Sequence, residues 1–263
     1  MAVVQAPVVA GMFYPDDPVQ LRADVLAYLD AAQPSEPGEA PKAMIVPHAG
    51  YRYSGPVAAM AYARLRPVAE RIERVVLMGP SHRVALRGIA ASGADWFETP
   101  LGRIAVDRDA IERLRGLDNV GQADVAFAQE HSLEVHLPFL QTMLGEFSLV
   151  PFVVGQADPR DVAAVLETLW GGPETLIVVS SDLSHYHDYA TCQGLDAETT
   201  RRIVALEGDC LTGNDACGVH PVRGLLRAAR HQGLTASVAD VRNSGDTAGP
   251  RDRVVGYGSY LFH

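Results

Sequence analysis

Three short apolar runs in this sequence end in the same way, because a histidine follows each of them within a few residues. His48, His82 and His185 come two, four and six positions after the runs, which are residues 44–46, 75–78 and 177–179. Continuous apolar runs of this length are typical of strands buried on both faces of a sheet. Open α/β sheets bind ligands beyond the carboxyl ends of their strands, so the pattern predicts three imidazoles at one edge.

The spacing of apolar residues along the whole chain predicts strands that alternate with helices. Strands are expected at residues 43–46, 74–78, 149–154, 176–179 and 254–261. Helices are expected at residues 17–31, 55–65, 109–114, 133–144, 159–170, 197–206 and 222–231. We therefore expect an α/β fold of three layers, α/β/α, with a mostly parallel or mixed central sheet. A stretch of alternating polarity, residues 88–107, adds an antiparallel hairpin beside it.

Length and charge restrict the class of protein further. A length of 263 residues is ordinary for one α/β domain, so residues 1–263 are expected to form a single domain, with 33–41 as a surface loop. The formal charge of −10 disfavours nucleic acid and anionic membranes as partners. The N-terminal residues make a poor signal peptide, and the sequence holds no apolar run long enough for a spanning helix. With three cysteines and no CxxC motif, a reducing cytoplasm fits best.

One of these cysteines has surroundings that suggest chemistry. Cys217 lies just ahead of the helix expected at 222–231, where the helix dipole stabilises a thiolate, and a thiolate is a strong ligand for soft metals. The alternative is that Cys217 is a small buried apolar residue. Cys192 and Cys210 lack comparable neighbours and are expected to be structural.

Other polar residues suggest a pocket around the histidines. Asp182 follows the third apolar run and has the position of a carboxylate that orients a metal-bound histidine or a water; a turn cap is the alternative. His131 and Glu134 stand three residues apart and can share a helix face as a pocket wall, or belong to a capped helix start. Tyr51 lies in a glycine-bounded loop that can present its ring to a ligand or merely turn the chain. Ser81 is outside any GxSxG motif.

Six segments of the sequence form a recognisable ordered set. They are 9–15 (VAGMFYP), 47–55 (PHAGYRYSG), 79–82 (GPSH), 130–138 (EHSLEVHLP), 180–185 (SSDLSH) and 217–221 (CGVHP). In this order they resemble the Memo family, whose bacterial and archaeal members are called AmmeMemoRadiSam system protein B, and the match runs from about residue 7 to the C-terminus.

This resemblance implies the fold of LigB-type class III extradiol dioxygenases, which are non-haem iron(II) enzymes. It implies three metal ligands, which are His48, His82 and Cys217. His185 matches the catalytic histidine and Asp182 an acidic residue of the same pocket. His131, Tyr51 and Ser81 are expected to line the substrate pocket. The family name implies an AMMECR-type protein and a radical SAM protein as partners.

One departure from the dioxygenases bears on the chemistry. Their third ligand is a carboxylate, whereas here the matching residue is Cys217. Iron or copper is therefore expected as the metal, with zinc as an alternative. The first hypothesis is a dioxygenase-like, metal-dependent oxidoreductase that acts on an unknown small molecule or peptide. The second is a non-catalytic scaffold that binds a metal or a peptide, and the third, weaker one is a zinc hydrolase.

Overall fold

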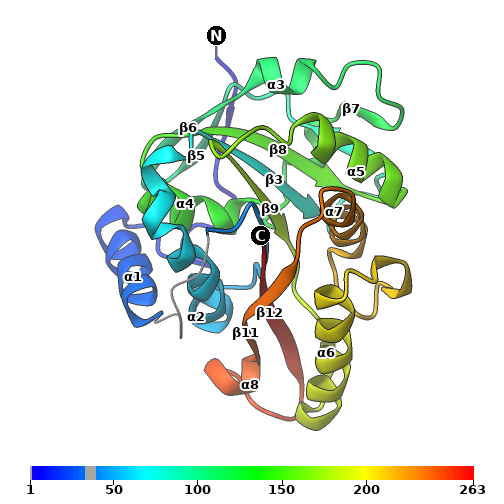
Figure 1. Ribbon diagram of the computed structural model, residues 1–263. Helices are drawn as coiled ribbons and strands as arrows, with labels where there is room; N and C mark the ends of the chain where they lie inside the picture. Colours follow the sequence, from blue (N-terminus) through cyan, green and yellow to red (C-terminus); the bar gives the residue numbers. More distant parts are fainter. Residues whose placement is uncertain (1, 33–39) are drawn as a thin grey trace.

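The computed structural model describes residues 2–32 and 40–263, and most of the expected surface loop 33–41 lies outside these ranges. The fold has three layers, in which helices cover both faces of a twelve-stranded mixed sheet (Figure 1). The expected α/β/α architecture is thereby confirmed. Within the described part of the chain, no helix has the length and apolar character needed to cross a membrane.

The elements follow one another in the alternation that the sequence predicts. The strands are β1 (Val4–Gln5), β2 (Ala43–Val46), β3 (Arg74–Pro80), β4 (Ile89–Ala91), β5 (Trp96–Thr99), β6 (Gly102–Val106), β7 (Val120–Gln122), β8 (Ser148–Val154), β9 (Thr175–Ser180), β10 (His185–His187), β11 (Ala236–Asn243) and β12 (Val254–Phe262). The α-helices are α1 (Pro18–Ala31), α2 (Tyr51–Tyr62), α3 (Arg108–Glu112), α4 (Leu137–Leu144), α5 (Pro159–Thr168), α6 (Tyr189–Val204), α7 (Val219–His231) and α8 (Ser244–Thr247). Short 3-10 helices are η1 (Ala63–Arg71), η2 (Asp124–Ala126), η3 (Glu134–His136) and η4 (Gly208–Cys210).

The three strands that deliver histidines are neighbours in the sheet. β3 pairs in parallel with β9, and β9 pairs in parallel with β2, so their carboxyl ends lie at one edge. β8 continues this parallel centre on the far side of β3, while β12 runs antiparallel beside β2. The prediction that these strand ends share one edge is therefore confirmed.

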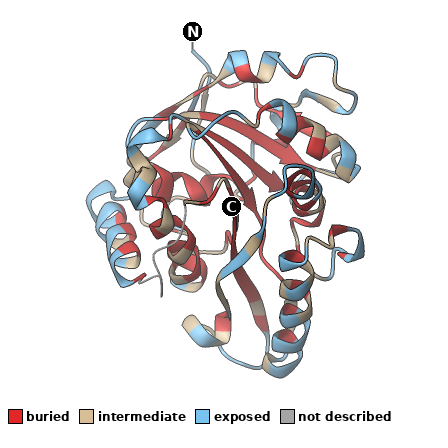
Figure 2. Ribbon diagram, in the orientation of Figure 1, coloured by how far each residue is buried: buried red, intermediate tan, exposed pale blue. Residues whose placement is uncertain are grey.

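The parallel strands are apolar throughout because each of them contributes to two cores. In β2, Met44 and Val46 belong to the core beneath α1, α2 and α4, whereas Ala43 and Ile45 belong to the core beneath α5, α6 and α7. Figure 2 shows the result as buried central strands between helices that are buried on one side only. Burying a Val, Leu or Ile side chain contributes roughly 1.5–3 kcal/mol, so this arrangement fixes the positions of the strand ends.

The hairpin and several helix starts differ in extent from the sequence-based expectation, and α7 begins three residues earlier than expected. The hairpin consists of β5 and β6 alone, and β6 joins it to the main sheet by pairing with β8. β4 pairs instead with β7 and β8. α6 begins earlier than expected because Asp188 caps it by accepting a hydrogen bond from the backbone N–H of Thr191. α2 likewise begins at Tyr51, four residues earlier than expected.

Candidate metal and ligand site

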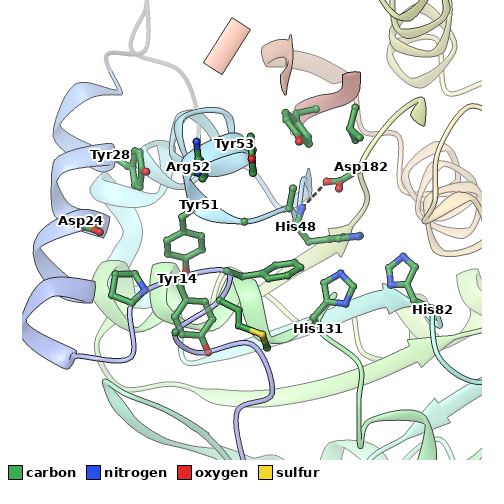
Figure 3. A pocket seen from close by; sticks show the side chains of 18 of the residues that line it. Tyr14, Asp24, Tyr28, His48, Tyr51, Arg52, Tyr53, His82, His131 and Asp182 are labelled. Atoms are coloured by element: carbon green, nitrogen blue, oxygen red, sulfur yellow. Dashed lines mark hydrogen bonds between the residues drawn. The ribbon is translucent and has the colours of Figure 1, made fainter. Parts of the chain in front are cut away.

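A cavity of about 770 Å³ opens at the carboxyl ends of β2, β3 and β9. His48 follows β2, His82 follows β3, and Asp182 and His185 follow β9, and all four side chains line it. His131, which precedes η3, lines it as well. Figure 3 shows the rings of His82 and His131 beside each other with His48 and Asp182 next to them.

Three of these imidazoles are close enough to share a metal ion. His48, His82 and His131 each offer one ring nitrogen, and these nitrogens lie within 4.8 Å of one another. The ring centroids are 5.0 to 5.6 Å apart in the three pairs. The resemblance placed His131 in the pocket wall; the structure groups it with the two histidines expected to be ligands.

Hydrogen bonding fixes the tautomer of His48. Its Nδ1 lies 2.5 Å from Ser180 Oγ, and Ser180 Oγ donates its own proton to the carbonyl of Ser132 at 2.6 Å. Since that hydroxyl has a single proton, it must accept from Nδ1–H of His48. The lone pair of His48 is therefore on Nε2, which is the form that binds a metal. Ser180 was not singled out in the sequence, and only its position after a buried strand hints at this role.

A buried carboxylate orients the other two imidazoles. Glu130 Oε1 lies 2.9 Å from Nδ1 of His82 and 3.5 Å from Nδ1 of His131. Its oxygens also accept from the backbone N–H groups of His82 and Ser132. At His82 this is the carboxylate–histidine hydrogen bond that leaves Nε2 for a metal, whereas the His131 ring makes a longer contact with the same oxygen. The sequence signal was its place directly before His131 in the segment that resembles the family.

Burial sets the charge of these groups. It lowers the pKa of His48 well below its ordinary value, and the nearby His82 and His131 lower it further. Burial also lowers the pKa of His131, although Glu130 opposes the shift. For Glu130, burial raises the pKa, but hydrogen bonds from His82 and the backbone outweigh it and bring the pKa to about 2. At neutral pH the imidazoles of His48 and His131 are therefore neutral donors beside the ionised carboxylate of Glu130.

Cys217 touches this site without joining the group of three. Its Sγ lies 3.5 Å from Nε2 of His48 and accepts a hydrogen bond from the backbone N–H of Asp182 at 3.2 Å. It immediately precedes Gly218, the N-cap of α7. Burial, followed by the Asp182 carboxylate, raises the pKa of the thiol to about 12, against the lowered pKa expected from the helix start. Cys217 also lines a second cavity of about 400 Å³.

Asp182 and His185 stand at the wall of the large cavity. One oxygen of Asp182 accepts the backbone N–H of His48 at 2.8 Å, and burial raises the pKa of this carboxyl. Nδ1 of His185 lies 2.8 Å from the carbonyl of Leu183 and donates to it, because a carbonyl only accepts. Nε2 of His185 is left with a lone pair, which allows it to accept a proton.

The other two residues expected in the pocket have different surroundings. Tyr51 lines the large cavity with its ring, while its hydroxyl donates to the carbonyl of Val135 at 2.8 Å. Ser81 lines the second cavity with Cys217, and its hydroxyl donates to the carbonyl of Val84. Glu134, expected to share a face with His131, instead binds the N-terminal segment by accepting from Tyr14 and from the backbone of Val8 and Val9. That segment then forms one wall of the cavity.

Comparison with known proteins places the whole chain within one group of relatives. A family profile described as "Memo-like protein" matches residues 5–261. A MEMO1 family protein of Aquifex aeolicus is 35% identical over 270 residues, covering 98% of this chain and 99% of its own. A MEMO1 family protein of Ignicoccus hospitalis is 34% identical over 283 residues, covering 98% of both chains. Among solved structures, an uncharacterized protein of Escherichia coli K12 is 10% identical, with a TM-score of 0.49, covering 83% of this chain and 98% of its own.

Proposed function

This chain belongs to the Memo-like protein family, and on that basis we propose that it binds a transition-metal ion through His48, His82 and His131. The observation that carries the proposal is the group of three ring nitrogens within 4.8 Å, at one end of a cavity of about 770 Å³. A cavity beside a three-ligand ion leaves room for a further ligand, as catalytic sites require and closed structural sites do not.

The donor set fits the metals that the family resemblance suggests. Imidazole suits iron, copper and zinc. The Nδ1–H groups of His48 and His82 donate to Ser180 and Glu130, which leaves their Nε2 atoms free for coordination. Iron or copper is favoured for an oxidoreductase, with zinc as the alternative. When bound, such an ion supplies redox or Lewis-acid chemistry to a ligand in the cavity.

The reaction we propose is a dioxygenase-like, metal-dependent oxidation of an unidentified small molecule or peptide. His185 is the acid–base group, since its free Nε2 can take a proton from a bound ligand and return it. Asp182 holds the backbone of His48 by accepting its N–H and lines the cavity beside it. Tyr51 and the N-terminal segment supply apolar walls that exclude water.

A contact of Cys217 supports a second donor set. Its Sγ lies 3.5 Å from Nε2 of His48, so a modest rotation would let the thiolate replace His131 as the third ligand. The family resemblance implies this second ligand set, which consists of His48, His82 and Cys217, and the two sets share His48 and His82. Coordination to a metal cation would stabilise the thiolate and release the thiol proton to solvent, which would offset the raised pKa of Cys217.

Elemental analysis of purified variants tests the proposal and separates the two sets. We expect about one equivalent of metal in the wild type, and a loss of most of it in His48→Ala and His82→Ala. His131→Ala should lose it as well if three imidazoles hold the ion, whereas Cys217→Ser should lose it if the thiolate does. Cys210→Ser, at an exposed cysteine, is the matched control. Metal content unchanged in all the histidine variants would refute the proposal.

The mouth of the cavity favours one further function, that of a non-catalytic scaffold in the cytoplasm. Met12 and Tyr186 line the cavity and are 72% and 63% exposed, so they offer apolar surface at its mouth for contact with a peptide or protein. AMMECR-type and radical SAM proteins are the proposed partners. Co-purification with either partner that persists in His48→Ala but is lost in Met12→Asp would favour the scaffold; oxygen consumption lost in His48→Ala would favour the enzyme.

A further inference from the structure

Tyr257, on β12, differs from the other buried tyrosines in the surroundings of its hydroxyl. The side chain is only 2% exposed, yet within the described ranges its hydroxyl has no hydrogen-bond partner. The hydroxyls of the other four buried tyrosines are all hydrogen-bonded. Tyr14 pairs with Glu134, Tyr51 with Val135, Tyr62 with His136 and Tyr260 with Thr200. The buried side-chain atoms of the described residues that lack a hydrogen-bond partner do not include this hydroxyl, and Tyr257 lines the large cavity, so the phenol can donate its proton to a ligand bound there.

The position of Tyr257 shows where that partner would bind. Tyr257 lines the large cavity together with the three imidazoles. β12 pairs antiparallel with β2 as far as Tyr260 and Ile45. Tyr257 lies beyond that pair, toward the carboxyl end of β2, which His48 follows. Backbone hydrogen bonds between Gly256 and the segment 183–184 tie the same part of β12 to the loop of Asp182 and His185. The phenol therefore belongs to the wall around the metal group.

The charges around the cavity indicate an anion. Imidazole ligands carry no charge and Glu130 supplies one negative charge beside them, so a divalent ion would keep one positive charge that favours an anionic further ligand. Arg52 and Arg83 line the cavity, and neither has a carboxylate partner among the residues that the structure describes. The two acidic lining residues are already engaged, Asp24 by the side chain of Gln20 and Asp182 by the backbone of His48.

We infer that Tyr257 is a ligand-binding residue that donates its hydroxyl proton in a hydrogen bond to a small oxyanion bound beside the three imidazoles. The inference rests on the proposed metal site and names the chemical class of its ligand. Arg52 and Arg83 attract the anion at the cavity mouth, and the ring of Phe13, which contacts His131 edge-on at 5.0 Å between centroids, offers an apolar surface for its body.

The test uses the cobalt(II)-loaded protein and benzoate, whose binding is followed through the visible absorption of the metal. We expect Tyr257→Phe to weaken benzoate binding by about tenfold or more, as the loss of one hydrogen bond to a charged group predicts. Cobalt affinity should be unchanged. Tyr260→Phe is the matched control, because its phenol lies on the same strand but pairs with Thr200, and it should bind benzoate like the wild type. Benzamide, the neutral analogue, should bind more weakly than benzoate.

The possible failures are distinguishable. Equal benzoate affinity in wild type and Tyr257→Phe, with both proteins fully loaded, overturns the role of Tyr257 and leaves the metal site intact. Equal binding of benzoate and benzamide overturns the anionic class of ligand. A wild-type protein that takes up no cobalt overturns the metal site and this inference together. Thermal unfolding without ligand adds a check: Tyr260→Phe should lower the midpoint by about 2–4 °C, while Tyr257→Phe should not.

Discussion

Glu130 is the residue whose replacement tests the electrostatics of the site most directly. Its carboxylate is 4% exposed, contacts Nδ1 of His82 and of His131, and has a pKa of about 2 against an ordinary value of 4.5. Because the folded state binds this proton more weakly than the unfolded state, the ionised group stabilises the fold above about pH 4.5. That contribution is lost as the pH falls toward 2.

The size of the effect follows from the shift. The fall in the pKa of Glu130 from 4.5 to about 2 corresponds to about 3 kcal/mol of unfolding free energy at pH 7, of which about 2 kcal/mol is lost by pH 3. In Glu130→Gln, the amide cannot carry the charge, and its N–H₂ group meets donors instead of acceptors. We therefore expect this variant to be about 2–3 kcal/mol less stable than the wild type at pH 7, with a smaller difference at pH 3.

The same substitution should weaken the metal site. Loss of the carboxylate that orients two ligand imidazoles is expected to lower metal affinity by roughly 10–100-fold. Urea unfolding at pH 7 and pH 3 measures the stability difference, and competition with a chelator measures the affinity. Glu146→Gln, at an exposed carboxylate, is the control and should change neither. Wild-type stability at pH 7 together with wild-type metal affinity in Glu130→Gln would contradict both roles of this carboxylate.

Three further predictions concern other parts of the structure. Ser180→Ala removes the acceptor that fixes His48, so chelator competition should show metal affinity reduced by about tenfold or more, while Ser180→Thr, which keeps the hydroxyl, should retain more of it. Glu134→Ala leaves the hydroxyl of Tyr14 and two backbone N–H groups without their acceptor, so urea unfolding should show an unfolding free energy about 2–4 kcal/mol lower. Hydrogen exchange at residues 8–14 should become faster, and unchanged exchange would contradict this role. Burial lowers the pKa of Lys42 from 10.5 to about 8, so between these pH values the unfolded state is protonated while the folded state is not. The unfolding free energy of the wild type, measured against Lys42→Met, should therefore rise between about pH 8 and 10.5.

The sequence determined the sheet and its edge because the signals are local. The apolar runs of β2, β3 and β9 are buried on both faces, so they had to be central strands, and their following residues had to meet at one edge. The boundaries of α1 were predictable for the same reason, since Asp17 and Pro18 cap and open the helix within a few residues. His48, His82, Asp182 and His185 followed from these strands.

The tertiary structure alone decided which groups act together within that edge. Glu130 reaches His82 across 48 positions of the chain, and Ser180 reaches His48 across 132. The unpaired hydroxyl of Tyr257 is evident only from the paired hydroxyls of the other buried tyrosines. Hydrogen bonds and burial depend on atoms brought together by folding, whereas strand and cap signals depend on neighbours along the chain. The sequence therefore determined where a site would form, and the packing determined its ligand nitrogens, its charges and its unoccupied donors.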